Sequence, residues 1–153
     1  MTGAASRTAR EAQDRAHAIL QAGTRGFLAT RTAAGGAVVH PISVFHRADG
    51  LWMNTYLKSA KARNMIRHPA VAVVVVECGA GAPRPPGVLV RGRAELLPED
   101  ADPPPATVEP AYLLPGVTAP VPGDPIWSLN GRRRWFRVPL TDVTLLEATD
   151  AQA

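Results

Sequence analysis

The chain contains only two lysines, Lys58 and Lys61, and they stand three residues apart in the segment Tyr56-Leu57-Lys58-Ser59-Ala60-Lys61. Every other basic side chain except histidine is arginine. A strand gives way to a helix at this point, and the first turn of a helix offers free backbone N–H groups and the positive end of the helix dipole. Compact ammonium groups beside such a turn predict a binding site for an anion, above all a phosphate. The alternative is that two lysines in one short stretch are a coincidence.

The net charge of +4 is unevenly distributed along the chain. Residues 55–76 contain basic side chains and no acid, residues 95–124 contain acidic side chains and no base, and residues 131–137 are basic again. A basic field of this kind attracts anionic ligands. The alternative is that the acidic stretch is a solvated loop and that the last basic run is a solvated face. That run contains Arg132, Arg133, Arg134 and Arg137.

Length and composition predict one folded domain over residues 1–148, followed by a disordered tail over residues 149–153. With 153 residues, 46% of them hydrophobic, the chain is long and apolar enough to build a single core. The single cysteine, Cys78, excludes an intrachain disulfide. No apolar run is long enough to cross a bilayer, and the charged segment Ser6–Leu20 differs from a secretory signal. We therefore expect a soluble cytoplasmic protein.

Two helices are predicted. The first covers residues 7–22, which are rich in alanine and contain no glycine or proline. The second covers residues 60–67, where Ser59 is a suitable N-cap. The step His68-Pro69 ends this helix, because proline disfavours a helical conformation in the residue before it.

Short strands account for most of the remaining chain. They are expected over residues 25–30, 37–46, 51–56, 70–77, 88–97, 134–138 and 143–147. The dipeptide Asp49-Gly50 is a hairpin signal, and the valine run within 70–77 predicts a strand covered on both faces. Residues 98–125, rich in proline and acid, form a long excursion between strands. The pattern predicts a mainly β fold, a six- to seven-stranded antiparallel barrel with flanking helices.

The order of these segments resembles the flavin-binding split-barrel family, which is the pyridoxamine 5′-phosphate oxidase-like superfamily. The most specific part is a strand ending in threonine, a short gap, Ser-x-Lys-x-x-Asn, a helix, a proline and a valine-rich strand. The resemblance covers residues 10–97 well and the C-terminal strands loosely. The matching segments are Gly26–Thr30, Val38–Phe45, Leu51–Thr55, Ser59–Asn64 and His68-Pro69, followed by the valine-rich strand.

The resemblance implies a dimeric split barrel whose cofactor lies in a groove between the two subunits. Members of the family use flavin mononucleotide (FMN) or the deazaflavin coenzyme F420, and a few bind haem. By position, Thr55, Ser59 and Lys61 would contact the cofactor phosphate. Lys58 and Asn64 match positions used by the deazaflavin-binding branch.

Further cofactor-binding residues follow from the same resemblance. The segment His40-Pro41-Ile42-Ser43 matches the strand that lies along the isoalloxazine ring and the ribityl chain. Asn54, next to the matched threonine at the end of its strand, is included with them.

Three departures argue against pyridoxamine phosphate oxidation. The oxidase has an arginine where this chain has Ala60, and another where this chain has His40; its C-terminal substrate-binding motif is not visible either. The resemblance therefore favours a reductase that moves hydride between a bound deazaflavin or FMN and a small organic substrate. No catalytic side chain is predicted, because the cofactor supplies the hydride chemistry.

His40 and His46 stand six residues apart on one predicted strand, so they are expected to share a face. No third ligand stands nearby, so no metal site is predicted. One histidine is expected to face the cofactor groove and the other the surface.

The arginine run Arg132–Arg134, with Trp127 and Trp135, is a candidate wall of the groove. The arginines would hold the anionic glutamate chain of a deazaflavin. The alternative for each tryptophan is packing in the core or at a subunit interface.

Two other functions stay open. A non-catalytic flavin, F420 or haem binding protein, acting in storage or sensing, would have the same site without turnover. A nucleic-acid-binding barrel would suit the basic, β-rich chain, but its strands lack the interleaved aromatic residues that stack on bases. No membrane partner is predicted.

Overall fold

The computed structural model describes residues 2–22, 25–77, 85–101 and 132–147, with side chains from residue 7 onward. Within these ranges there are two helices, α1 (Thr2–Ala22) and α2 (Ala60–Arg67), and nine strands. The strands are β1 (Arg25–Arg31), β2 (Ala37–Ser43), β3 (Phe45–Arg47), β4 (Gly50–Tyr56), β5 (Ala70–Val76), β6 (Gly87–Arg93), β7 (Glu95–Leu96), β8 (Arg133–Val138) and β9 (Asp142–Leu146).

The strands form two sheets. The five-stranded sheet has the order β2-β1-β5-β6-β9, and the four-stranded sheet has the order β3-β4-β8-β7. Neighbouring strands are antiparallel throughout both sheets. The structure therefore confirms the mainly β, antiparallel split-barrel fold that the sequence predicts.

Two expected strands are each divided between the sheets. Residues 37–46 form β2 in one sheet and β3 in the other, with Val44 at the corner, and residues 88–97 form β6 and β7, with Ala94 at the corner. Val44 is fully buried and Ala94 is 8% exposed, because each corner residue faces the space between the sheets. A chain that crosses between packed sheets keeps its apolar residues at the bend, so the sequence shows no interruption there. This division gives nine strands where six or seven were predicted.

The main core fills the space between the two sheets and is closed by the C-terminal part of α1. Leu20 of α1, Leu28 of β1 and Phe136 of β8 are among its most deeply buried members. A second cluster packs on the opposite face of the four-stranded sheet and contains Phe45, Trp52, Leu97 and Trp135. Trp135 is only 6% exposed and packs in this cluster. Of the two positions considered for it, the core and the groove wall, the structure shows the core.

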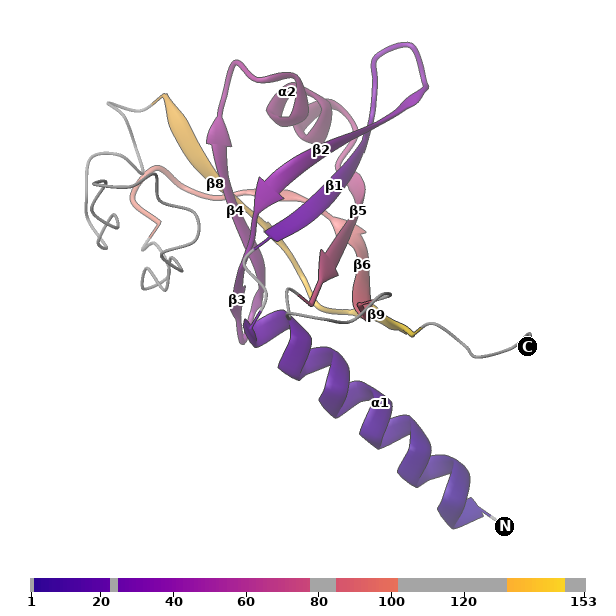
Figure 1. The fold of residues 1–153 in the computed structure, drawn as a ribbon. Helices are drawn as coiled ribbons and strands as arrows, with labels where there is room; N and C mark the ends of the chain where they lie inside the picture. The colour runs from indigo at the N-terminus through magenta and orange to yellow at the C-terminus, as the bar shows by residue number, and fades with distance from the viewer. Residues whose placement is uncertain (1, 23–24, 78–84, 102–131, 148–153) are drawn as a thin grey trace, which may run out of the picture.

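The two helices lie at opposite ends of the barrel (Figure 1). Helix α1 packs against β9 and extends away from the sheets. Helix α2 follows β4 and sits near the end where β4 finishes and β8 begins. The first turn of α2 is therefore close to the first residues of β8.

The hairpin between β3 and β4 forms at the predicted Asp49-Gly50 dipeptide, where Arg47 pairs with Gly50. Gly50 has a φ of 151°, and a Cβ at this position would lie 2.6 Å from the carbonyl oxygen of Val138 on β8. No real side chain tolerates that distance, so glycine lets β8 lie directly against β4. The two strands then pair from Leu51 with Val138 to Tyr56 with Arg133.

Several local predictions are confirmed. Helix α2 has the predicted bounds, with Ser59 as its N-cap and His68 at its end. The valine-rich strand β5 forms in the middle of the five-stranded sheet, but after exposed Ala70 its residues alternate between buried and half-buried, so one face is fully covered rather than both as predicted. Helix α1 begins earlier than predicted, at Thr2. No helix in the described ranges is long and apolar enough to span a membrane.

Some predictions fall on residues that the structure does not describe. They concern most of the proline-rich excursion 98–125, the tail 149–153, Cys78 and Trp127.

Candidate functional site

Ser59 organises the turn between β4 and α2. Its backbone is extended, and its hydroxyl accepts a hydrogen bond from the N–H of Ala62 at 3.2 Å. The hydroxyl of Thr55, at the end of β4, lies 3.2 Å from Ser59 Oγ. The backbone N–H groups of Ala60 and Lys61 have no hydrogen-bond partner in the part of the chain that is described. The turn thus presents two free backbone donors beside a hydroxyl, an arrangement that favours an anion.

Lys61 lies within this first turn and is half-buried. Burial lowers the pKa of its ammonium group, and the positive charge of Arg133 lowers the pKa further. The first turn contains no acidic residue. The helix dipole disfavours a cation at a helix N-terminus. The charge of Lys61 is therefore unfavourable in the free protein, and a bound anion would compensate it.

Arg133 is the second half-buried cation of this region and comes from β8. Its guanidinium carbon lies 4.9 Å from the ring centroid of Tyr56, its partner across the strands. Its Nη2 donates a long hydrogen bond of 3.4 Å to the carbonyl oxygen of Asn54, and its Nε is buried without a partner. Burial lowers the pKa of Arg133, while interaction with Tyr56 acts in the opposite direction.

Lys61 and Arg133 therefore form a pair of like charges that are partly removed from water. Neither makes an ion pair with a carboxylate among the residues described. Two desolvated cations without a counter-charge fit a phosphate or another compact anion. We call Ser59, Lys61 and Arg133, with the free N–H groups of the first turn of α2, the anion cradle.

The structure places four of the predicted residues at or beside this turn, namely Thr55, Lys58, Ser59 and Lys61. Thr55 is only 2% exposed, and its hydroxyl is hydrogen-bonded to that of Ser59. Lys58 is exposed, in the turn that leads into α2. These positions are compatible with the expected phosphate contacts, with Thr55 acting through Ser59.

The two predicted asparagines lie elsewhere. Asn64 is 7% exposed, and its Nδ2 donates to the hydroxyl of buried Thr30 at 3.0 Å, which ties α2 to β1. Asn54 is 8% exposed and pairs with Trp135 across the strands, so its side chain shares the face of the second core cluster rather than that of Thr55. A cofactor contact from either side chain stays a prediction and forms no part of the anion cradle.

The segment His40-Pro41-Ile42-Ser43 lies in β2 and alternates between two faces. His40 is half-buried and Ile42 belongs to the main core, whereas Pro41 and Ser43 are exposed on the outer face of the sheet. A strand offers only alternate residues to one ligand, so all four cannot lie along the same ring. His40 has a buried Nδ1 without a partner, which leaves it available for a contact.

The expectation that His40 and His46 share a strand is wrong. The chain turns at Val44, so His40 is in β2 and His46 is in β3 of the other sheet. His46 meets His17 of α1 instead, with an edge-to-face contact and 5.9 Å between ring centroids. Burial and then the neighbouring His17 lower the pKa of His46. No cluster of three metal-ligating side chains occurs in the described ranges.

The arginine run does not act as one wall. Arg134 faces away from Arg133 and donates to the carbonyl oxygen of Leu97 at 2.7 Å. Arg132 is exposed, and its carbonyl oxygen accepts a hydrogen bond from the N–H of Leu57. Arg133 is the arginine of this run that we assign to the cradle, because it pairs with Tyr56 at the end of β4 and its charge acts on Lys61. The sequence could not show this, because it depends on how β8 pairs with β4.

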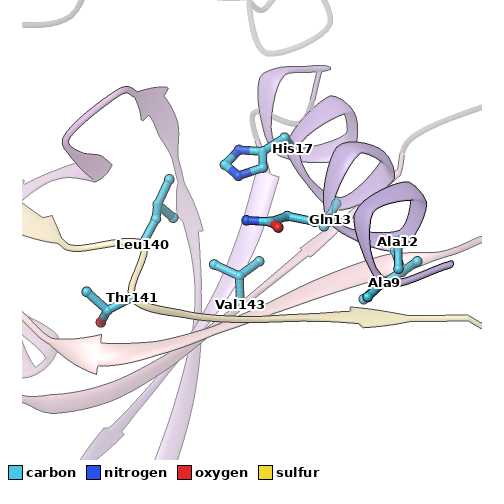
Figure 2. Close-up of a pocket in the computed structure, with 9 residues that line it drawn as sticks. Ala9, Ala12, Gln13, His17, Leu140, Thr141 and Val143 are labelled. Carbon is cyan, nitrogen blue, oxygen red and sulfur yellow. The ribbon is translucent and has the colours of Figure 1, made fainter. Parts of the chain in front are cut away.

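A separate cavity of about 310 Å³ lies between α1 and β9, at the other end of the barrel. Figure 2 shows Gln13 and His17 pointing from α1 towards Val143, Leu140 and Thr141. None of the predicted site residues lines this cavity.

Comparison with protein families gives a match over most of the chain. Residues 12–145 match the family model described as pyridoxamine 5′-phosphate oxidase. The chain belongs to the pyridoxamine 5′-phosphate oxidase family. The matched segment contains both sheets and α2, and therefore the whole anion cradle. A comparison with curated proteins gave no match.

Solved structures with the same fold include proteins that bind different redox groups. An F420 reductase is 23% identical, with a TM-score of 0.59 and 84% of this chain and 94% of the other covered. An FAD-binding protein from Mesorhizobium loti is 22% identical, with a TM-score of 0.61 and coverage of 88% and 94%. A haem-binding protein from Mycobacterium smegmatis is 16% identical, with a TM-score of 0.66 and coverage of 91% and 55%. At these identities the likeness shows the fold alone.

Proposed function

We propose that this member of the pyridoxamine 5′-phosphate oxidase family is an oxidoreductase that binds a phosphorylated flavin or deazaflavin and moves hydride between it and a small organic substrate. The observation that carries the proposal is the pair of half-buried cations, Lys61 and Arg133, beside the first turn of α2 without a carboxylate partner in the described residues. FMN and coenzyme F420 both carry a phosphate that such a cradle would hold.

The protein's own contribution is binding and orientation. The Ser59 hydroxyl, the free N–H groups of Ala60 and Lys61, and the two cations would hold the phosphate. The cofactor, when bound, supplies hydride transfer. Each charged hydrogen bond to the phosphate contributes about 1.5–3 kcal/mol, so two or three of them are enough to anchor the cofactor by one end.

Spectroscopy of the purified protein tests this function. We expect either a bound flavin spectrum or a colourless protein that binds F420 or FMN in a fluorescence titration. Reduced cofactor on the protein should then be reoxidised, without oxygen, by members of a panel of small unsaturated organic compounds. A Soret band together with no affinity for either phosphorylated cofactor would overturn the proposal, as would tight binding without turnover by any acceptor.

We also propose that two copies of the chain associate through the outer face of the five-stranded sheet. Phe27 of β1 stands opposite Pro41 of β2 on one side and Val74 of β5 on the other, and Leu89 of β6 continues the row. Phe27 is 49% exposed, and Val39 on the same face is 59% exposed. A contiguous exposed apolar face suits a partner surface, and the dimer implied by the family resemblance gives a second copy as the occupant.

Light scattering coupled to gel filtration measures this directly. The wild-type protein should elute at twice the chain mass of 16.2 kDa, and Phe27→Asp should shift it towards one chain mass. A wild-type monomer at micromolar concentration would refute the dimer.

A further inference from the structure

We infer that Arg133 is a phosphate-binding residue of the cofactor site and that Tyr56 positions it. The inference rests on the proposed function and deepens it, because it selects Arg133 from the arginine run, assigns it the phosphate and names the residue that holds it in place. Arg133 stands on β8, and the intervening residues 102–131 lie outside the described structure.

The arginines of β8 differ in what their side chains contact. Arg137 donates to Asp49 Oδ2 at 2.8 Å and to Glu95 Oε2 at 2.6 Å, so its charge is neutralised within the protein. Arg134 donates to the Leu97 carbonyl oxygen at 2.7 Å. Arg133 makes only a long hydrogen bond of 3.4 Å to the Asn54 carbonyl oxygen. Its guanidinium otherwise lies over the face of the Tyr56 ring.

Arg133 also carries unused hydrogen-bonding capacity. A guanidinium has five N–H donors. The buried Nε is unpartnered in both Arg133 and Arg134, but Arg134 donates a 2.7 Å hydrogen bond to Leu97 whereas the hydrogen bond from Arg133 is long, at 3.4 Å. A half-buried cation with an unsatisfied donor is costly unless a ligand completes it. The positive charge of Arg133 lowers the pKa of Lys61 in the first turn of α2, so the two cations lie in the same region.

The ring of Tyr56 holds the guanidinium of Arg133 in position. The two residues face each other across β4 and β8, with the guanidinium carbon 4.9 Å from the ring centroid. An aromatic face holds a guanidinium by a cation–π interaction and leaves its edge donors free. Tyr56 is therefore a positioning residue, and its ring, rather than its hydroxyl, is the part that matters.

The test compares ligands with and without a phosphate. Wild-type protein and Arg133→Gln are titrated with FMN and riboflavin, and with F420 and its phosphate-free deazaflavin alcohol. We expect Arg133→Gln to weaken the phosphorylated member of whichever pair binds by about 10- to 100-fold and to leave the phosphate-free member unchanged. The two pairs of ligands show whether the phosphate belongs to a flavin or a deazaflavin.

The matched control is Arg67→Gln, which removes one exposed positive charge from the other end of α2. It should change no affinity by more than about threefold, as expected for a surface charge. Circular dichroism and thermal melts establish that each variant folds. If Arg133→Gln does not fold, Arg133→Lys replaces it; this variant keeps the charge, loses the fork geometry and should weaken only the phosphorylated ligand.

Tyr56 is tested by two substitutions. Tyr56→Phe should bind like wild type, whereas Tyr56→Leu should weaken the phosphorylated ligand by about two- to fivefold, the magnitude of an exposed cation–π contact. Equal effects of Arg133→Gln on both members of a pair, or none on either, would overturn the inference while the proposed function stands. A wild-type protein that binds neither phosphorylated ring would overturn both.

Discussion

The two ends of β8 carry arginines in opposite electrostatic circumstances. At the end near the Asp49-Gly50 hairpin, Arg137 sits between Asp49 and Glu95, and its pKa is raised by the hydrogen bonds that they accept. At the other end, Arg133 has no carboxylate partner among the described residues, and its charge lowers the pKa of Lys61. Both arginines lie on the same face of the same strand. An arginine paired with carboxylates stabilises the fold, whereas an arginine without a carboxylate partner is available to a ligand.

The largest effect on ligand affinity should come from placing a negative charge in the anion cradle. Ser59→Asp should lower affinity for the phosphorylated cofactor by more than about 100-fold, because a carboxylate repels the phosphate. Aspartate is an equally good N-cap and favours the helix dipole, so the melting temperature should stay level or rise. Calorimetric titration and thermal melts measure the two effects.

Ser59→Ala is the control for this substitution. It should lower the free energy of unfolding by about 1 kcal/mol through the lost cap, with a smaller loss of affinity than Ser59→Asp. Retained affinity in the aspartate variant would mean that the phosphate does not bind at this turn.

Removing one cation from the cradle should have the next largest effect. Lys61→Ala should lower affinity for the phosphorylated cofactor about 10- to 100-fold, since a charged hydrogen bond is lost. The free energy of unfolding of the ligand-free protein should not fall, because the lysine stands against the helix dipole. Titration of folded protein, checked by circular dichroism, measures this, and an unchanged affinity would contradict the cradle.

Removing the cation at the opposite end of β8 should give the reverse pattern. Arg137→Ala should lower the free energy of unfolding by about 0.5–1 kcal/mol, a value reduced for solvent screening of partly exposed ion pairs. Affinity for the cofactor should stay within about twofold, since its partners are Asp49 and Glu95. Urea denaturation and cofactor titration together give the two numbers. A loss of affinity without a loss of stability would reverse the assignment of the two ends.

The smallest expected effect is on acid stability. Burial alone would raise the pKa of Asp49, but hydrogen bonds from Arg137 and Trp52 outweigh it and hold the pKa below its ordinary value of 3.8. A depressed carboxyl pKa adds stability that is complete above pH 3.8 and is lost as the pH falls through the folded-state value. Urea midpoints below pH 3.8 should therefore fall more steeply for wild type than for Arg137→Ala. Parallel curves would show that the pair contributes nothing.

The sequence predicted the local half of this site well. Ser59 as an N-cap, the bounds of α2 and the Asp49-Gly50 hairpin all depend on neighbours within a few residues, so the chain signals them directly. The family resemblance then suggested that these elements bind a cofactor phosphate.

The non-local half could not be read in the same way. Val44 and Ala94 are apolar residues inside apolar stretches, and only the packing of two sheets makes them corners. That corner separated His40 from His46, which the sequence placed on one strand. Likewise, Arg133 is distinguished from Arg134 only by the register of β8 against β4, since shifting that register by one residue would exchange their faces.

Gly50 links these observations over the length of a strand. The absence of a side chain there lets the Val138 carbonyl sit against β4, and the pairing that begins at this contact ends with Arg133 opposite Tyr56. The close contact at Gly50 thus sets the position of β8 along β4. A methyl group added at Gly50 would displace β8 and shift the Arg133 guanidinium at its other end. Affinity for the proposed cofactor should therefore depend on a residue remote from the cradle.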